Sequence, residues 1–150
     1  YVLNLNLLNI RPMALDDVTH ISQIEREITP HPWAEGQFID SHEKHSCLTM
    51  TMSGTVIGYA IYNIIIDDAE ILNIAVDSEH QNKGYGRHLL DYMISAVSKN
   101  AKRFFLEVRA SNSNAIYLYE DVGFCSICVR KNYYQTSLKN ENAILMAMEL

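Results

Sequence analysis

Several features that would place this chain in a special class of protein are scarce or missing. Its 150 residues include three cysteines, too few for a disulfide framework. The longest apolar run, Ile57–Ile66, is interrupted by polar residues and is too short to span a bilayer. The first ten residues lack the basic flank and cleavage site of a signal peptide. No linker, repeat or low-complexity tract is present, so we expect residues 1–150 to form a single domain in the cytoplasm.

Basic residues are also in the minority. Twelve lysines and arginines stand against 18 aspartates and glutamates, which gives a formal net charge of −6. Affinity for nucleic acid comes mainly from lysine and arginine on phosphates, so direct nucleic-acid binding is not expected. An acidic surface fits a cationic partner better.

The cysteines and histidines do not form a recognisable metal or redox motif. Cys125 and Cys128 are spaced as CxxC, but they lie in a segment that resembles a strand rather than the start of a helix. In a regular strand this spacing directs the two thiols to opposite faces, and we expect both to be buried structural residues. His42 and His45 are able to share a helix face, but no third ligand accompanies them, so no metal is expected.

Hydrophobic periodicity predicts an alternation of strands and helices, which indicates an α/β domain with a mixed sheet. The helices are expected at Leu15–Ile28, Glu35–Ser41, Gly84–Ser98 and Asn112–Asp121. The strands are expected from Leu3 toward Arg11 and at Ser46–Met52, Thr55–Ile66, Glu70–Val76, Arg103–Arg109, Phe124–Arg130 and Ala143–Leu150. Pro30 and Pro32 end the first helix, and Gly123 is expected to cap the last one in a left-handed conformation.

The most informative segment joins a strand to a helix. The sequence Ile74-Ala-Val-Asp77 is followed by Gln81-Asn-Lys-Gly-Tyr-Gly-Arg87, in which two glycines open the helix. Glycines allow the backbone to approach a ligand closely, and the free amides of a helix N-terminus bind anions. Lys83 and Arg87 add positive charge, so a bound phosphate or pyrophosphate is predicted. The dinucleotide and P-loop patterns both fail here, and an ordinary tight turn remains the alternative reading of Gly-x-Gly alone.

This Gln-x-x-Gly-x-Gly junction resembles the acetyl-CoA-binding motif of the GNAT superfamily of N-acetyltransferases. Later segments are similar to the same family, namely Leu106–Asn112, Ala115–Tyr119 and Gly123-Phe124. Pro32-Trp33, Asn132–Tyr134 and Ala143–Ala147 are similar to its bacterial ribosomal-protein-alanine N-acetyltransferases (RimI type). Asn82, where the family usually has Arg or Gln, and Gln135, where proline commonly follows the paired tyrosines, depart from the pattern.

The resemblance implies a fold and a set of site residues. The fold is a mixed, mostly antiparallel sheet with helices on both faces and a splayed strand pair that holds CoA. Acetyl-CoA would contact Ile74, Ala75, Val76, Asn82, Lys83, Gly84, Tyr85, Gly86, Arg87 and Asn112. Glu107 matches the general base and Tyr119 the general acid, whereas Trp33, Tyr133 and Tyr134 would line the acceptor groove.

Each of these residues also has a simpler interpretation. Glu107 would serve as a partner for Arg109 or lie on an exposed strand face, and Asn112 would serve as an N-cap. Tyr119 would be a core aromatic, and Tyr117, on another helix face, is its nearby competitor as the acid. The loop aromatics Trp33, Tyr133 and Tyr134 would serve in packing. With the resemblance, the expected function is transfer of acetyl from acetyl-CoA to the N-terminal alanine of a small-subunit ribosomal protein, by a monomer. The alternatives are a GNAT enzyme that acts on lysine or a small amine, and a non-catalytic acetyl-CoA-binding module.

Overall fold

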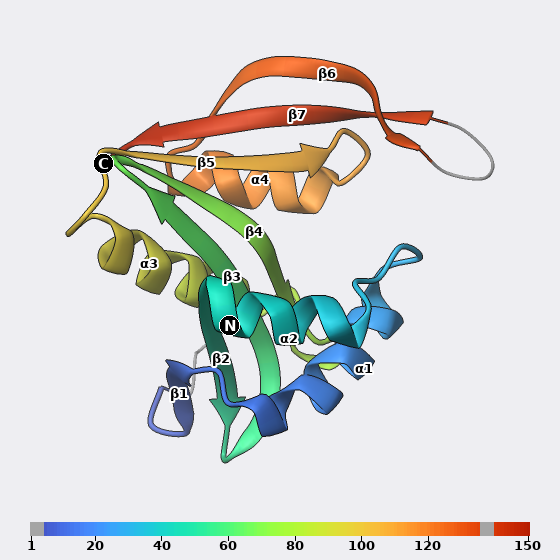
Figure 1. The fold of residues 1–150 in the computed structure, drawn as a ribbon, viewed down its shortest axis with the longest axis vertical. Coiled ribbons are helices and arrows are strands. Elements are labelled where there is room, and N and C mark those ends of the chain that lie inside the picture. Colours follow the sequence, from blue (N-terminus) through green and yellow to red (C-terminus); the bar gives the residue numbers. More distant parts are fainter. Residues whose placement is uncertain (1–4, 136–139) are drawn as a thin grey trace. The chain divides into compact units, whose positions relative to one another are not determined.

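The computed structural model describes residues 5–135 and 140–150, which form a seven-stranded sheet with helices (Figure 1). The sheet order is β1-β2-β3-β4-β5-β7-β6. The strands are β1 (Leu8–Pro12), β2 (Ser46–Met52), β3 (Thr55–Ile65), β4 (Asp68–Val76), β5 (Arg103–Arg109), β6 (Cys125–Gln135) and β7 (Asn140–Glu149). The helices are η1 (Leu15–Asp17), α1 (Val18–Ile28), α2 (Glu35–Lys44), η2 (Ser78–His80), α3 (Tyr85–Val97) and α4 (Ser113–Val122).

Pairing directions make this a mixed sheet. The pairs β1–β2, β2–β3, β5–β7 and β6–β7 are antiparallel. β4 pairs with β5 in parallel over Asp68–Glu70 and Arg103–Phe105, although the two strands continue to Val76 and Arg109. The expected α/β class with a mostly antiparallel sheet and helices is confirmed.

The described residues divide into two compact units. The N-terminal unit comprises residues 5–63 and 72–92, and the C-terminal unit comprises the described parts of 64–71 and 93–150. In the N-terminal unit, α1 and α2 pack against β3 and β4 through a buried apolar cluster. Its fully buried members include Ile21 of α1, Phe38 of α2 and Tyr59 of β3. This core fixes the loop between α1 and α2 against the sheet.

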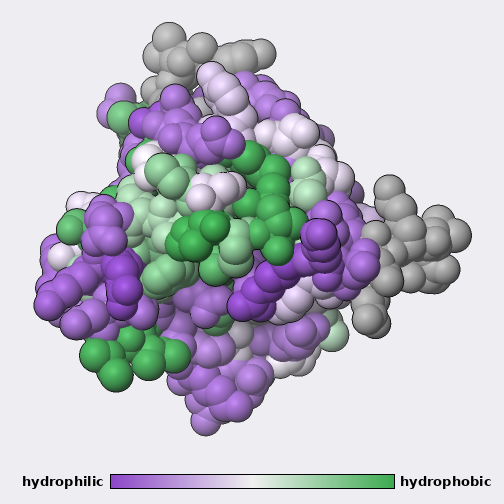
Figure 2. Space-filling view, turned by 90° about the horizontal axis from the view of Figure 1, so that it is seen from above, coloured by the Kyte–Doolittle hydropathy of each residue, from purple (hydrophilic) through white to green (hydrophobic). Residues whose placement is uncertain are grey.

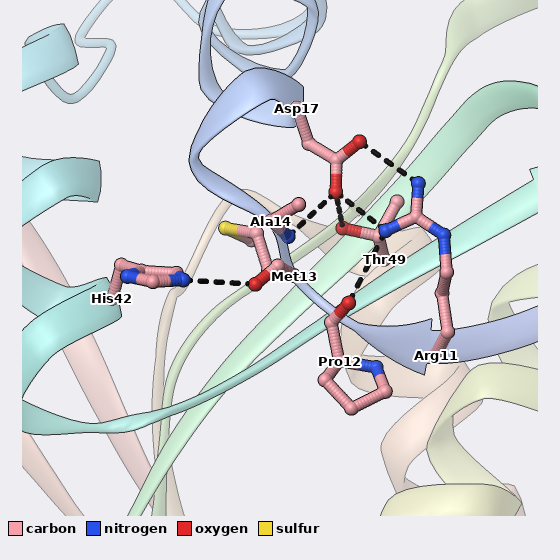
Figure 3. A network of polar contacts seen from close by, with 7 residues as sticks. All are labelled: Arg11, Pro12, Met13, Ala14, Asp17, His42 and Thr49. Carbon is pink, nitrogen blue, oxygen red and sulfur yellow. Dashed lines mark hydrogen bonds and ion pairs between the residues drawn. The ribbon is translucent and has the colours of Figure 1, made fainter.

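A polar network fastens the start of α1 to β1 and β2 in the N-terminal unit (Figure 3). The Asp17 carboxylate accepts two hydrogen bonds from the Arg11 guanidinium, at 2.6 and 2.9 Å. It also accepts the Ala14 N–H at 2.8 Å and the Thr49 hydroxyl at 3.1 Å. The Arg11 hydrogen bonds hold the pKa of Asp17 below its ordinary value. Asp17 is therefore an ionised anchor of the helix start.

In the C-terminal unit, α4 covers one face of β5. The Phe104 and Phe124 rings lie 5.5 Å apart, and the Tyr119 ring of α4 lies 5.9 Å from Phe124. Phe104, Leu106 and Val108 are buried, whereas Glu107, between the last two, is only partly buried. Because side chains alternate along a strand, Glu107 lies on the face opposite to α4.

A bulge in β6 corrects the expectation for the CxxC pair. Cys125 pairs with Ala147 and Cys128 with Leu145, because the register shifts by one residue between Ser126 and Cys128. Ala147 and Leu145 share a face of β7, so the two thiols share a face as well. Both cysteines are exposed, on a strand at the end of the sheet. The prediction of buried thiols on opposite faces is therefore wrong.

The first strand is shorter than predicted. Residues 5–7 form a turn and β1 begins only at Leu8, and the expected strand start at Leu3 lies outside the described residues.

The surface carries a hydrophobic area on one face, bordered by hydrophilic residues (Figure 2). Among the described residues, no helix combines the length and apolar character that crossing a membrane requires.

Candidate active site

The predicted pyrophosphate loop follows the end of β4 in the N-terminal unit. Asp77 donates its N–H to the Ile57 carbonyl at 2.8 Å. Its Oδ1 accepts the His80 N–H at 3.0 Å and lies 2.6 Å from His80 Nδ1. Gln81 donates through Nε2 to the Val76 carbonyl at 2.9 Å. These contacts fold η2 back on the strand end, so the chain enters α3 from a fixed point.

Two residues with positive φ then turn the backbone into α3. Asn82 has φ of 59° and Gly84 has φ of 90°. Glycine adopts this region without strain and asparagine tolerates it better than most residues, which explains Asn82 at this departure from the family pattern. Residues 81–84 are exposed, and α3 begins at Tyr85. The first N–H groups of a helix have no acceptor within it, and its dipole favours negative charge there.

The basic side chains of this loop are held near the helix start. The Lys83 ammonium donates to the Glu79 carbonyl at 2.9 Å. Arg87 Nε lies 3.4 Å from Asp91 Oδ2, one helical turn further on. Both basic residues are exposed. The local arrangement is an exposed helix N-terminus with two basic side chains beside it.

Gly58 of β3 is a residue that sequence reasoning missed. A Cβ on Gly58 would stand 2.8 Å from the Ala75 carbonyl of β4, closer than real Cβ contacts come. Ala75 is the middle of the segment Ile74–Val76 predicted to contact CoA. Any side chain at position 58 would displace this strand. A glycine inside an otherwise apolar strand was the signal for such a close approach.

Trp33 lies in the loop between α1 and α2. Its backbone N–H donates to Glu25 Oε2 at 2.9 Å, and its ring lies 5.3 Å from that of Phe38. Phe38 in turn makes an edge contact with Tyr59, with centroids 5.5 Å apart. The partly buried indole is therefore fixed by both its backbone and its ring. Glu25 was not predicted, although a carboxylate between Ile24 and Ile28 on an apolar helix face was a signal.

Glu107 of β5 pairs with an arginine other than the predicted Arg109. Its Oε1 lies 2.9 Å from Arg130 NH1, and 19% of its side chain is exposed. The Arg130 guanidinium carbon lies 5.1 Å from the centre of the Tyr133 ring. Glu107 of β5 pairs with Leu145 of β7, which pairs with Cys128 of β6. Arg130 lies two residues beyond Cys128 on β6, so its long side chain reaches Glu107 across β7. Sequence reasoning had no means to see this long-range pair.

Tyr119 and Asn112 lie at the two ends of α4. Tyr119 is buried and meets Phe124 edge-on, whereas the competing Tyr117 is 75% exposed. Asn112 caps the helix, because its Oδ1 accepts the Ala115 N–H at 3.3 Å. The N-cap interpretation of Asn112 is confirmed, and Gly123 ends the helix with a left-handed φ of 119°, as predicted.

The β5–α4 loop, which carries Asn112, is tied to the start of β7. Glu141 accepts hydrogen bonds from the Ser111 N–H, at 3.0 Å, and from the Ser111 hydroxyl. Arg109 NH1 donates to Glu141 Oε2 at 3.3 Å. The Ser111 hydroxyl is the main reason that the pKa of Glu141 lies below its ordinary value. Arg109 thus serves this loop rather than Glu107.

The predicted site residues fall into two groups. Trp33 and the CoA-binding residues from Ile74 to Arg87 belong to the N-terminal unit, and Glu107, Asn112, Tyr119 and Tyr133 to the C-terminal unit. Within the second group, Arg130 links Glu107 to Tyr133. The side chain of Tyr134 lies outside the described residues. No group of three His, Cys, Asp or Glu side chains in the described parts of the chain is arranged to hold a metal ion.

Comparisons with known proteins identify relatives of this chain along nearly its whole length. Residues 15–124 match the acetyltransferase (GNAT) family. The [ribosomal protein bS18]-alanine N-acetyltransferase of Escherichia coli (strain K12) is 36% identical over 143 residues, 94% of this chain and 97% of that protein. The enzyme of the same name from Haemophilus influenzae is 36% identical over 137 residues, 89% and 93% of the two chains.

Solved structures agree with this result. The crystal structure of the ribosomal-protein-S18-alanine N-acetyltransferase from Escherichia coli has a TM-score of 0.88 at 35% identity, and the match covers 95% of this chain and 93% of that one. The structure of Ard1 from Thermoplasma volcanium has a TM-score of 0.88 at 27% identity, covering 96% and 98%. Both similarities span both compact units.

Proposed function

Since this chain belongs to the acetyltransferase (GNAT) family, we propose that it transfers the acetyl group of acetyl-CoA to the N-terminal alanine of ribosomal protein bS18. The observation that carries the substrate is the 36% identity to the Escherichia coli enzyme over 94% of the chain. We therefore expect this chain to act on the α-amine of a protein N-terminus. We further propose that residues 1–150 act as one catalytic domain, as a monomer in the cytoplasm and without nucleic acid.

We propose that acetyl-CoA, which supplies the thioester, binds along the strand end and loop of the N-terminal unit. Backbone groups of Ile74–Val76 bind the pantetheine and orient the thioester. The N–H groups of Asn82–Arg87 bind the pyrophosphate, supported by the positive φ of Asn82 and Gly84 and by the exposure of the loop. Asn112, the N-cap of α4, is proposed as a further residue that binds CoA.

We propose Glu107 as the general base. Its partial exposure, on the face opposite to α4, leaves it accessible to an acceptor amine or a bridging water. The Arg130 ion pair orients the carboxylate. Glu107 accepts the amine proton as the nitrogen bonds to the acetyl carbon and the carbon–sulfur bond breaks.

We propose Tyr119 as the general acid that protonates the departing thiolate. The burial of the residue and its edge contact with Phe124 support the role, because they hold the ring, and with it the hydroxyl, in a fixed position. The exposure of Tyr117 argues against that residue as the acid. Tyr119→Phe should retain CoA binding and lose turnover by about 10²–10⁴-fold.

We propose that Trp33, Tyr133 and Tyr134 line the acceptor groove and that an α-amine is preferred over a lysine amine. The α-amine has a pKa of about 7.7–8.0 and lysine about 10.4, a difference of roughly 2.5 units. Deprotonating lysine at neutral pH therefore costs about 3.4 kcal/mol more. A single carboxylate base meets the smaller requirement more readily.

The function is tested by competition between two peptides. One begins Ala-Arg, and the other has the same sequence with a blocked N-terminus and a free lysine. Faster acetylation of the first, followed by mass spectrometry, is expected. Faster acetylation of lysine would replace the proposal by a lysine acetyltransferase, and no turnover at all would leave a CoA-binding module.

The CoA site is tested separately by Gly86→Glu. The added bulk and negative charge beside the proposed pyrophosphate position should abolish CoA binding while the domain stays folded. Calorimetry with CoA measures the affinity and circular dichroism checks the fold. Unchanged affinity in the folded variant would remove residues 82–87 from the site.

A further inference from the structure

Glu25 is a buried carboxylate for which the proposed mechanism has no use. It lies in α1 and is 4% exposed. Its Oε1 accepts the Tyr59 hydroxyl at 2.7 Å. Its Oε2 accepts the Trp33 N–H at 2.9 Å and the Asn73 side-chain amide at 3.1 Å. One carboxylate therefore ties a loop, β3 and β4 to helix α1, all within the N-terminal unit.

A carboxylate suits these contacts, because it accepts at both oxygens. The Trp33 N–H and the Asn73 amide converge on Oε2, and an alanine at position 25 would leave all three donors without this acceptor. The three groups that donate to Glu25 are neutral, and burial, together with the negative charge of Glu25, raises the pKa of Tyr59. A buried carboxylate without a bonded cation is costly, and such networks rigidify what they connect.

The parts that Glu25 joins depend on it to different degrees. β3 and β4 are strands of the sheet and keep their positions through the ladder. Trp33 lies between α1 and α2, in a loop without regular hydrogen bonding. Asn73, which donates to the same Glu25 oxygen as Trp33, immediately precedes the segment Ile74–Val76. The carboxylate thus fixes the backbone of a proposed acceptor residue relative to the strand proposed to orient the thioester.

We propose that Glu25 is a positioning residue for the acceptor, which clamps the Trp33 backbone to β4 through Asn73. This proposal rests on the proposed function, in which Trp33 lines the acceptor groove. Loss of the clamp releases the loop and weakens peptide binding. It leaves CoA affinity intact, because the strand and the helix N-terminus keep their own contacts.

The test compares Glu25→Ala with a matched control, Asp17→Ala. Both remove a buried carboxylate of the N-terminal unit, but Asp17 contacts neither Trp33 nor Asn73. Glu25→Ala is expected to raise the KM for an Ala-Arg peptide about tenfold, because it removes the hydrogen bonds that hold the Trp33 loop. The CoA Kd and the KM of Asp17→Ala should stay within about twofold of the wild-type values.

Asn73→Ala is the second variant, in case Glu25→Ala does not fold. It breaks the link to β4 while the carboxylate keeps two donors, so a peptide KM increase of about threefold is expected. An unchanged peptide KM in either folded variant overturns the clamp, and so does an equal increase in Asp17→Ala. Trp33→Ala tests whether Trp33 contacts the acceptor peptide. An unchanged peptide KM in this variant would refute both that contact and the clamp. Failure of the proposed function would appear differently, as no α-amine acetylation by the wild-type enzyme.

Discussion

The two compact units use their carboxylates differently. In the N-terminal unit, Asp17 and Glu25 are buried and accept hydrogen bonds from groups of the same unit. In the C-terminal unit, Glu107 and Glu141 keep 19% and 16% of their side chains exposed. A buried carboxylate holds geometry, whereas one that water reaches is able to exchange a proton. The comparison favours a positioning role for the first pair, a loop-anchoring role for Glu141 and the proposed proton transfer for Glu107.

The largest expected effect comes from Glu107→Gln. The amide cannot accept the amine proton, so kcat/KM should fall by about 10²–10⁴-fold, and more severely at low pH, where the amine is harder to deprotonate. Steady-state kinetics over a pH series measures this, with a thermal melt to check the fold. Glu70→Gln, at an exposed carboxylate of β4, is the control and should leave the rates unchanged. Near-wild-type turnover of Glu107→Gln would place Glu107 with the structural carboxylates.

The second effect is on stability. Asp17→Ala removes the acceptor of Arg11, Ala14 and Thr49 and should lower the free energy of unfolding by about 2–4 kcal/mol. Urea denaturation measures the loss, and the kcat of the folded fraction should be unchanged. A loss below about 0.5 kcal/mol would contradict the anchoring role.

The third effect is the pH dependence of the same anchor. Because the Arg11 hydrogen bonds lower the pKa of folded Asp17, its contribution is complete above the unfolded value of about 3.9. The contribution is lost as the pH falls through the lower folded pKa. The stability difference between wild type and Asp17→Asn should therefore shrink progressively below about pH 4. Urea titrations at a series of pH values test this, and a constant difference would count against an ionised anchor.

The smallest effect is expected from Glu141→Gln. Glu141 keeps one accepting oxygen after the change and lies near the surface, so its ties to Ser111 and Arg109 weaken only partly. The midpoint of thermal unfolding should shift less than in Asp17→Ala. A larger shift would show that the β5–α4 loop depends on this carboxylate as much as α1 depends on Asp17.

Local patterns predicted most of the secondary structure. The strand Arg103–Arg109 has the predicted bounds, and α3 differs from the predicted Gly84–Ser98 by one residue at each end. These elements follow from periodicity and from glycines that act within a few residues. The motif from Gln81 to Arg87 also predicted where a helix N-terminus would be presented.

What the sequence left open depends on pairing between distant segments. The ion pair of Glu107 with Arg130 forms across β7, and the contacts of Glu25 join residues up to 48 positions apart. The exposure of Cys125 and Cys128 follows from a register shift and from the place of β6 at the sheet end. Periodicity within one segment contains no information about which distant segments pair or in which register.

The bulge in β6 has a practical consequence for probes. Cys125 and Cys128 are exposed on one face and accessible to a water-soluble maleimide, whereas burial raises the pKa of the Cys47 thiol to about 11 and suppresses its thiolate. Cys128 lies on the face of Glu107, two strands away, at a spacing of about 10 Å. After Cys125→Ser, a single fluorophore at Cys128 would sit beside the proposed base and report peptide arrival optically, with no engineered cysteine.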